Sequence, residues 1–183
     1  MKPVLLAIAL FAFIKPQAQG VFSNSTIVTL QKVVSDYPNH FSNISGKIIR
    51  QSEAQTDYLS LLSIPGAISC TVSRSSNERK DTYSWKCVLF ETDKFSVVKS
   101  RYRQIFDQIR NSIIKIEGEK PFILNGPASE PSEHKRQHTI SFRLLPATGG
   151  FATVRIDLNL YKEANLWKIS LMVHSPQPSV GAE

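Results

Sequence analysis

Strict alternation of apolar and polar side chains in the last third of the chain limits its fold more than any other sequence feature. Residues 138–145, 151–161 and 166–174 each place apolar side chains at every second position. Side chains of a strand point to opposite faces with a period of two, so these segments predict strands with one apolar and one polar face. The predicted apolar side chains are Ile140, Phe142, Leu144, Val154, Ile156, Leu158, Leu160, Trp167, Ile169, Leu171 and Val173. An antiparallel sheet of this kind needs a cover over its apolar face, which amphipathic helices supply.

Two segments have the spacing of such helices. Apolar side chains recur every three or four residues from Ile27 to Tyr37, and Pro38 ends that run because proline cannot continue a helix. A longer amphipathic helix is predicted over residues 94–115. Its apolar side chains are Phe95, Val98, Tyr102, Ile105, Phe106, Ile109 and Ile113.

Three further strands are predicted between these helices, over residues 57–64, 67–74 and 83–91. Residues 39–56 have no clear period, and residues 117–137 are rich in proline and glycine, which predicts a loop. The short apolar island Phe122-Ile123-Leu124 interrupts that loop and is expected to reach the core. The chain therefore predicts an α+β fold, with antiparallel sheet covered by amphipathic helices in the order α-βββ-α-βββ.

The two halves of this pattern, residues 21–92 and 93–175, resemble each other. An offset of 82 residues aligns Trp85-Lys86 with Trp167-Lys168 and Thr71-Val72 with Thr153-Val154. Over residues 58–90 against 140–172, eight of the 33 aligned residues are identical. An internal duplication is one interpretation, and the composition that all hairpins share is the other.

The N-terminus has the pattern of a secretory signal peptide over residues 1–20. Lys2 precedes an apolar run that ends near Ile14, and Ala18-Gln19-Gly20 supplies small residues for cleavage. The apolar run is too short to span a bilayer of about 30 Å. No cysteine follows it to carry a lipid. We expect residues 21–183 to be a single domain, secreted or periplasmic, with no transmembrane segment after cleavage.

Two cysteines, Cys70 and Cys87, lie on neighbouring predicted strands, and the polar run at residues 75–81 lies midway between them. A hairpin turning in that run would place the two cysteines opposite each other, at a Cα separation that suits a disulfide. A disulfide also fits an oxidising compartment outside the cytoplasm. The alternative, a redox-active pair, lacks the C-x-x-C spacing that lowers a thiol pKa.

The formal charge of the whole chain is +7, and Lys2 and Lys15 leave with the signal peptide, so the mature chain carries +5. This charge favours acidic partners such as an envelope polymer, a lipid headgroup or an acidic protein, although it also serves solubility alone. Nucleic acid is not expected for an exported protein. Candidate ligand-binding side chains are Lys99, Arg103 and Arg110, which form a basic stripe on the long helix, and Arg155 and Lys168, which lie on the polar face of the sheet.

No motif in the sequence indicates catalysis. His134 and His138 are four residues apart, but the cations between them and the strand that follows do not suit a metal site, so no metal and no cofactor is predicted. There is no G-x-S-x-G turn, and no paired carboxylates are placed by spacing.

We therefore expect an exported, non-catalytic binding domain that uses the polar face of its sheet or a groove beside the long helix. One alternative is a carrier of a hydrophobic or amphipathic molecule between the sheet and the helices. A second alternative is a hydrolase that acts on cell-envelope polymers, with a site assembled from distant segments.

Overall fold

The fold is described from a computed structural model, which covers residues 25–77 and 80–176. The predicted signal peptide, residues 1–20, lies outside these described residues. The helices are α1 (Ser25–Asp36) and α2 (Phe95–Ile109), and short 3₁₀ turns occur at Tyr37–Asn39, Ser42–Ile44 and Gly149–Phe151. The strands are β1 (Ser45–Gln51), β2 (Gln55–Ser60), β3 (Ser69–Ser76), β4 (Asp81–Thr92), β5 (Ile113–Ile114), β6 (Phe122–Asn125), β7 (Gln137–Leu145), β8 (Arg155–Glu163) and β9 (Leu166–His174).

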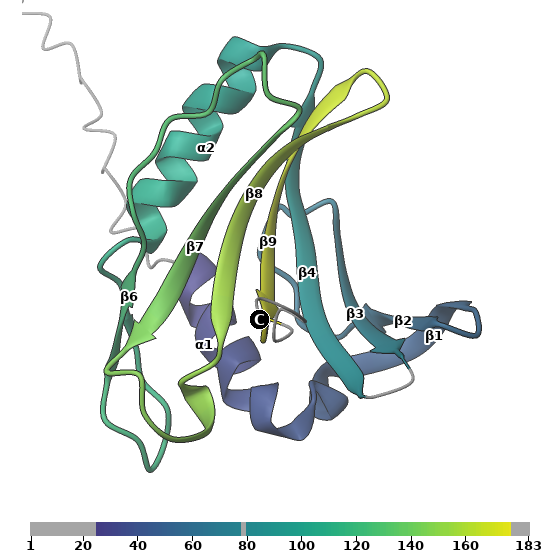
Figure 1. The fold of residues 1–183 in the computed structure, drawn as a ribbon, viewed down its shortest axis with the longest axis vertical. Helices are drawn as coiled ribbons and strands as arrows, with labels where there is room; N and C mark the ends of the chain where they lie inside the picture. Colours follow the sequence, from purple (N-terminus) through teal and green to yellow (C-terminus); the bar gives the residue numbers. More distant parts are fainter. Residues whose placement is uncertain (1–24, 78–79, 177–183) are drawn as a thin grey trace, which may run out of the picture.

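These strands form one antiparallel sheet of nine strands in the order β1-β2-β3-β4-β9-β8-β7-β6-β5 (Figure 1). The α+β class with antiparallel sheet is confirmed. The observed order of elements differs from the expected order α-βββ-α-βββ, because four strands follow the first helix and five follow the second. Residues 39–56, which have no clear period, contain β1, and residues 113–125, predicted as the end of the second helix and a loop, contain β5 and β6.

Helix α2 ends six residues earlier than its apolar spacing predicts. Asn111 has a φ of 60°, in the left-handed region that ends helices. Beyond it the backbone is extended, so Ile114 is fully buried while Ile113 is half exposed. Ile113 therefore does not belong to the buried face of α2, although its spacing from Ile109 is helical.

The core lies between α1, α2 and one face of the sheet. Every alternating apolar side chain predicted for the last three strands is buried, as are Ile105 and Ile109 of α2. The Phe106 ring lies 5.7 Å from that of Phe142, and Tyr102 donates its hydroxyl hydrogen to the Leu158 carbonyl at 3.0 Å. The predicted island reaches the core as well, because Phe122 and Leu124 are fully buried in β6.

Strands β4 and β9 pair at the centre of the sheet, and each contributes a buried tryptophan. Trp85 pairs with Val173, and Trp167 pairs with Thr92. A shift of 82 residues exchanges Trp85 with Trp167 and maps Val173 onto residue 91. The observed partner of Trp167 is Thr92, one residue further along the chain. A bulge between Val88 and Phe90 accounts for that one residue. Any antiparallel pair of strands maps onto itself in this way, so the register does not test a duplication, and common ancestry of the halves stays a prediction.

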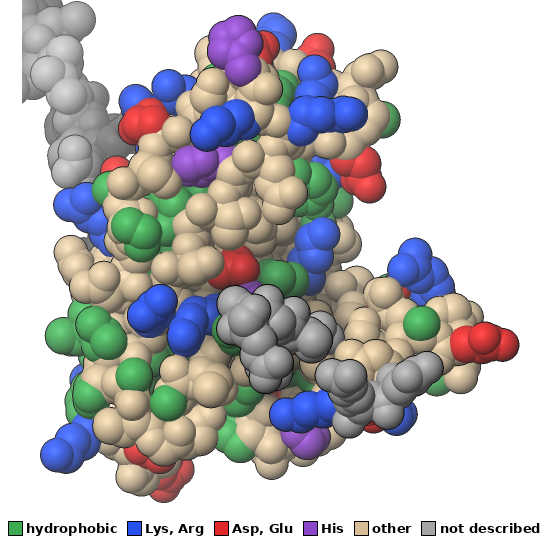
Figure 2. Space-filling view, viewed as in Figure 1, with side chains coloured by type: hydrophobic (Ala, Val, Ile, Leu, Met, Phe, Trp, Pro, Cys, Tyr) green, Lys and Arg blue, Asp and Glu red, His purple; other side chains and the backbone are tan. Residues whose placement is uncertain are grey.

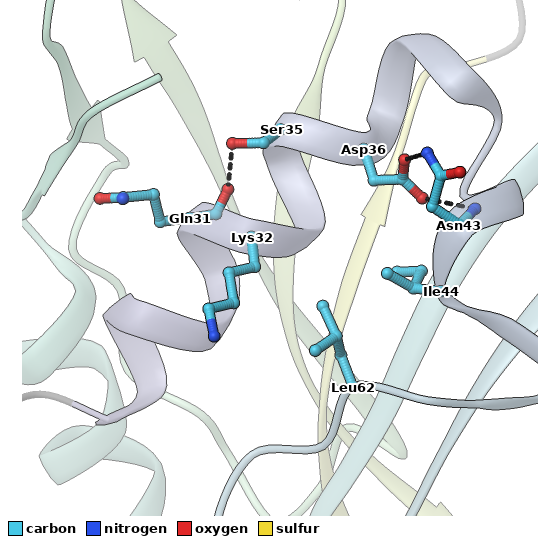
Figure 3. Close-up of a pocket in the computed structure, with 7 residues that line it drawn as sticks. All are labelled: Gln31, Lys32, Ser35, Asp36, Asn43, Ile44 and Leu62. Carbon is cyan, nitrogen blue, oxygen red and sulfur yellow. Dashed lines mark hydrogen bonds between the residues drawn. The ribbon is translucent and has the colours of Figure 1, made fainter. Parts of the chain in front are cut away.

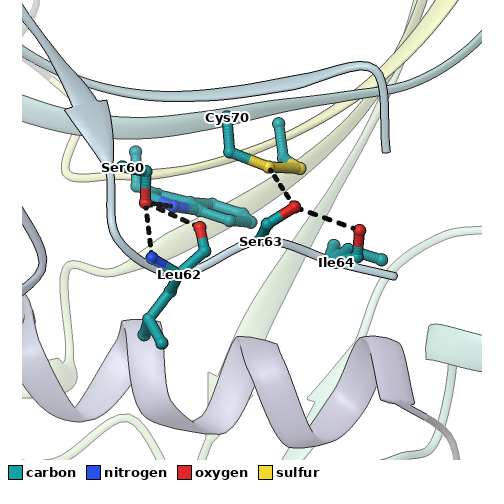
Figure 4. Close-up of a disulfide and its surroundings, with 7 residues drawn as sticks. Ser60, Leu62, Ser63, Ile64 and Cys70 are labelled. Carbon is teal, nitrogen blue, oxygen red and sulfur yellow. Dashed lines mark hydrogen bonds between the residues drawn. A yellow bond between two sulfur atoms is a disulfide. The ribbon is translucent and has the colours of Figure 1, made fainter. Parts of the chain in front are cut away.

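Cys70 and Cys87 form a disulfide between paired positions of β3 and β4, with their Cα atoms 4.0 Å apart (Figure 4). The predicted bridge is confirmed, and the Cα separation is shorter than the usual range of about 4.4–6.8 Å. Both cysteines are buried beside Trp85 in the core. Ser63, in the segment after β2, lies against the bridge with its Oγ 3.7 Å from Cys70 Sγ.

Candidate ligand-binding site

The face of the sheet opposite the core carries polar side chains, and we call it the open face. Its residues on the four central strands pair across the sheet in rows. One row is Lys86, Met172, Asp157 and Ser141, and the next is Val88, Ser170, Asn159 and Thr139. Figure 2 shows basic side chains gathered at the upper end of the molecule, where β7 begins and β8 turns into β9. The predicted polar face is therefore present as a surface built from four strands.

A hollow of about 410 Å³ lies on the open face. Its lining residues are Lys86, Arg136, Gln137, Asn159, Tyr161, Lys162, Ser170 and Met172. Three of these side chains are cationic and none is acidic. No ion pair involves Lys86, Arg136 or Lys162 in the part of the chain that the structure describes. The lining therefore contains three cations and no carboxylate, while Glu163, which is paired with Lys168, lies close enough to Lys86 to interact with its charge.

Ser170 lines this hollow, and the surroundings of its hydroxyl group are unusual. The residue is 0% exposed, and its Oγ has no hydrogen-bond partner among the described residues. A buried hydroxyl without a partner costs about 1–3 kcal/mol, so native proteins seldom contain one. This atom is the strongest indication that another molecule completes the site.

Lys86 and Tyr161 together cover Ser170. The Lys86 Nζ lies 4.9 Å from the centre of the Tyr161 ring. Lys86 pairs with Met172, and Tyr161 pairs with Lys168, so this contact crosses β9 at the residue between them, Ser170. A cation–π contact on a half-exposed ring contributes only about 0.5–1 kcal/mol, so the cover is weakly held.

A second polar cluster lies next to the hollow on the same face. Asp157 accepts a hydrogen bond from Ser141 Oγ at 2.6 Å, and its other oxygen lies 2.9 Å from His174 Nε2. Burial acts to raise the pKa of Asp157, but the hydrogen bonds from His174 and Ser141 outweigh it and lower that pKa. The hydrogen bond to Asp157 raises the pKa of His174, although burial opposes it.

This cluster contains the residue types of a hydrolytic triad in a different arrangement. In a triad the histidine lies between the serine and the carboxylate, so that it can take the serine proton. Here Asp157 lies between Ser141 and His174, and the histidine does not contact the serine. A separate serine–histidine contact joins Ser129 Oγ to His138 Nε2 at 3.1 Å. No carboxylate bonds to His138 within the described residues, so neither pair has the complete geometry.

The basic stripe predicted on α2 lies on the core side of the sheet, away from the hollow. Glu130, from the loop before β7, forms ion pairs with Lys99 at 3.4 Å and with Arg103, whose Nε donates to it at 2.9 Å. Arg110 lies 3.8 Å from Asp107 and over the Phe106 ring. The sequence separates Glu130 from the helix, so the spacing of the basic residues could not indicate this partner.

The other two predicted ligand-binding residues lie on the open face. Arg155 donates to the backbone carbonyls of Ala152 and Val154, at 3.2 Å and 2.9 Å. Lys168 is paired with Glu163 at 2.7 Å and with Glu91 at 3.7 Å. The five predicted residues are thus divided between two sides of the sheet, and their ligand-binding roles stay predictions.

Another hollow, of about 380 Å³, lies beside α1 and includes Lys32 and Leu62 in its lining (Figure 3). Its buried carboxylate, Asp36, accepts hydrogen bonds from the side chains of Asn39 at 3.0 Å and Asn43 at 2.6 Å. The Asn43 backbone N–H donates to the other oxygen of Asp36 at 3.1 Å. These bonds hold the 3₁₀ turns after α1, so the buried carboxylate of this hollow already has its partners.

Metal-binding clusters and membrane-spanning helices are both absent from the described ranges. No group of three or more His, Cys, Asp or Glu side chains there is placed to hold a metal ion. Neither described helix is both long enough and apolar enough to cross a membrane.

Comparison of the chain with models of known families, with curated proteins and with solved structures finds no significant match. The residues of the hollow are therefore the only basis for a functional argument. Sequence reasoning did not select Lys86, Arg136 or Ser170. A signal for Lys86 was present, because alternation with the buried Trp85 places it on the polar face. Ser170 gave no signal, since a serine on a polar face is ordinary.

Proposed function

We propose that this protein is an exported, non-catalytic binding domain that holds an acidic ligand in the hollow on the open face. The unpartnered hydroxyl of Ser170, buried beneath the cationic Lys86, is the single observation that carries the proposal. Export is inferred from residues 1–20 and is supported by the disulfide, which suits an oxidising compartment.

The charge distribution supports an acidic ligand. Lys86, Arg136 and Lys162 line one hollow without a carboxylate in its lining, and the Lys162 ammonium also lies 5.3 Å from the centre of the Trp167 ring. In contrast, Glu130 already pairs with Lys99 and Arg103 on α2. A free cation in a concave site attracts an anion more strongly than one that is already paired.

The rows of the sheet also support binding rather than catalysis. A general base needs a nucleophile within hydrogen-bond reach, and His174 bonds to the carboxylate of Asp157 without contacting the Ser141 hydroxyl. The hydrogen bonds of Ser141, Asp157 and His174 therefore hold the side chains of the open face beside the hollow in place.

The test is a titration of the purified protein with low-molecular-weight dextran sulfate, a generic polyanion, followed by two-dimensional amide NMR. We expect shift changes on β8, β9 and the centre of β4. The double variant Lys86→Gln/Arg136→Gln should bind dextran sulfate at least about tenfold more weakly than the wild type does.

Lys99→Gln/Arg103→Gln is the matched control, because it removes two positive charges as well, but from the basic stripe on α2. We expect its affinity to stay within about twofold of the wild-type affinity. Shift changes confined to α2, or a larger loss in the α2 variant than in the hollow variant, would refute the proposed site.

A further inference from the structure

We infer that the ligand is an acidic carbohydrate, whose sugar ring takes the place of the Lys86 ammonium on Tyr161 and whose hydroxyl bonds to Ser170. This inference rests on the proposed function and names the chemistry of its ligand. It follows from three features of the hollow: an unpartnered hydroxyl, an aromatic ring and a mixture of neutral and cationic polar groups.

The hydroxyl of Ser170 sets the first requirement. A serine hydroxyl donates one hydrogen bond and accepts two, so its best partner is a group that both donates and accepts. Ligand hydroxyls have this property, whereas a carboxylate or a phosphate diester only accepts. Because Ser170 is 0% exposed, a ligand reaches it only when the Lys86 side chain moves.

The Tyr161 ring sets the second requirement. Its face is occupied by the Lys86 ammonium at 4.9 Å, and the residue itself is half buried. An aromatic face offers apolar area to a flat partner, and the C–H face of a sugar ring is such a partner. Lys86 has a flexible stem and gains a charge-assisted hydrogen bond by turning from the ring to a ligand carboxylate.

Neutral groups among the cations set the third requirement. Asn159 and Gln137 line the hollow beside Arg136 and Lys162. Asn159 already accepts from Thr139 Oγ1 at 2.7 Å and donates to the Asp157 carbonyl at 3.3 Å, while the Gln137 side chain makes no hydrogen bond within the described part of the chain. An amide can both donate and accept, as neighbouring sugar hydroxyls require. A carboxylate or phosphate group alone would use the cations and leave these neutral groups and Ser170 without a role.

The experiment compares three anionic ligands of similar charge and one neutral oligosaccharide by isothermal titration calorimetry with the purified exported protein at one ionic strength. The probes are hexagalacturonate, hexaglutamate, a hexathymidylate and neutral maltohexaose. We expect hexagalacturonate to bind about tenfold more tightly than each of the other three. Ser170→Ala should weaken hexagalacturonate about fivefold and leave hexaglutamate within about twofold of wild type.

Tyr161→Leu keeps an apolar side chain and removes the aromatic face, so it should weaken hexagalacturonate selectively as well. Ser69→Ala, an exposed serine of β3 outside the hollow, is the control and should change neither affinity. Circular dichroism of each variant reports whether the fold is retained.

Two negative outcomes have different meanings. If hexaglutamate or hexathymidylate binds as tightly as hexagalacturonate, and Ser170→Ala has no effect, the carbohydrate inference is wrong while the acidic-ligand proposal stands. If none of the polyanions binds at the hollow, both are wrong. Tight binding of maltohexaose would show a carbohydrate site that does not need an acidic group, and would overturn the acidic part of the inference.

Discussion

The indole N–H of Trp85 donates a hydrogen bond to Ser60 Oγ at 2.9 Å, inside the core beside the disulfide (Figure 4). Ser60 also accepts from the Leu62 backbone N–H at 3.2 Å and donates to the Leu62 carbonyl at 2.7 Å. Ser170 is the second buried serine of the described residues, and its hydroxyl has no partner at all. The two serines therefore form a natural comparison of satisfied and unsatisfied hydroxyl groups.

Replacing each serine by alanine should change stability in opposite directions. Ser60→Ala leaves the buried Trp85 N–H unpaired, so we expect it to lower the free energy of unfolding by about 1–3 kcal/mol. Ser170→Ala removes a polar atom that gains nothing in the unliganded protein, so we expect a rise of about 1 kcal/mol. Urea unfolding of both variants provides the measurement. A loss of stability in Ser170→Ala as large as that in Ser60→Ala would show that Ser170 has a partner in solution.

The disulfide between Cys70 and Cys87 should stabilise the fold by restricting the unfolded chain. Cys70 and Cys87 are 17 residues apart, and a loop of that length predicts about 3 kcal/mol of stabilisation from the reduced entropy of the unfolded chain. Urea unfolding with and without a reductant measures this difference. Eight paired positions still join β3 to β4, so we expect the reduced protein to remain folded. Loss of the folded state on reduction would mean that the hairpin depends on the bridge.

Stability should depend on pH through the contact between His174 and Asp157. The raised pKa of His174 means that its stabilising effect is complete below its ordinary pKa of about 6.5 and is lost as the pH rises through the raised value. The lowered pKa of Asp157 means that its effect is complete above about 3.9 and is lost as the pH falls through the lowered value. The pair should therefore stabilise the fold most between these limits.

The test is the free energy of unfolding from pH 3 to pH 9 for the wild type and for His174→Gln. We expect the variant to be less stable by about 1 kcal/mol near pH 5 and to approach the wild type as the pH rises through the raised pKa of His174. His134→Gln is the control, because His134 is exposed and makes no ion pair with a described residue. A constant difference across the pH range would show that His174 acts through packing alone.

The hydrogen bond between Tyr102 and Leu158 joins α2 to the middle of β8 at 3.0 Å. Burial raises the pKa of the Tyr102 hydroxyl, so it stays protonated and donates throughout the accessible pH range. Tyr102→Phe should cost about 1 kcal/mol in the free energy of unfolding. Tyr58→Phe is the matched control, because no described residue forms a hydrogen bond with the Tyr58 hydroxyl. Equal effects of the two substitutions would contradict a specific role for the Tyr102 bond.

How much of this fold the sequence predicts depends on how local the signal is. The strand β9 begins and ends at the predicted residues, because alternation from Leu166 to His174 is a property of neighbours along the chain. The end of α2 was predicted too late, because Ile113 continues the helical spacing while the backbone at Asn111 turns away. Strand β1 was not predicted, since its side chains are largely exposed and leave no apolar period.

The candidate site depends on contacts that have no local signal. Lys86 and Tyr161 are 75 residues apart, and only the pairing of β4 with β9 and of β9 with β8 brings them together above Ser170. The partner of the predicted basic stripe, Glu130, is likewise distant from α2 in the chain.

The sequence alone determined which side chains are apolar, where they alternate and where they follow a helical period, because burial of oily surface acts through spacing along the chain. It also placed the two cysteines on facing strands. Tertiary structure decided which polar residues share a surface, which cations already have a carboxylate beside them, and which hydroxyl lacks a partner. Hydrogen bonds and ion pairs depend on distances of a few ångströms between remote segments, and those distances exist only after the sheet has formed.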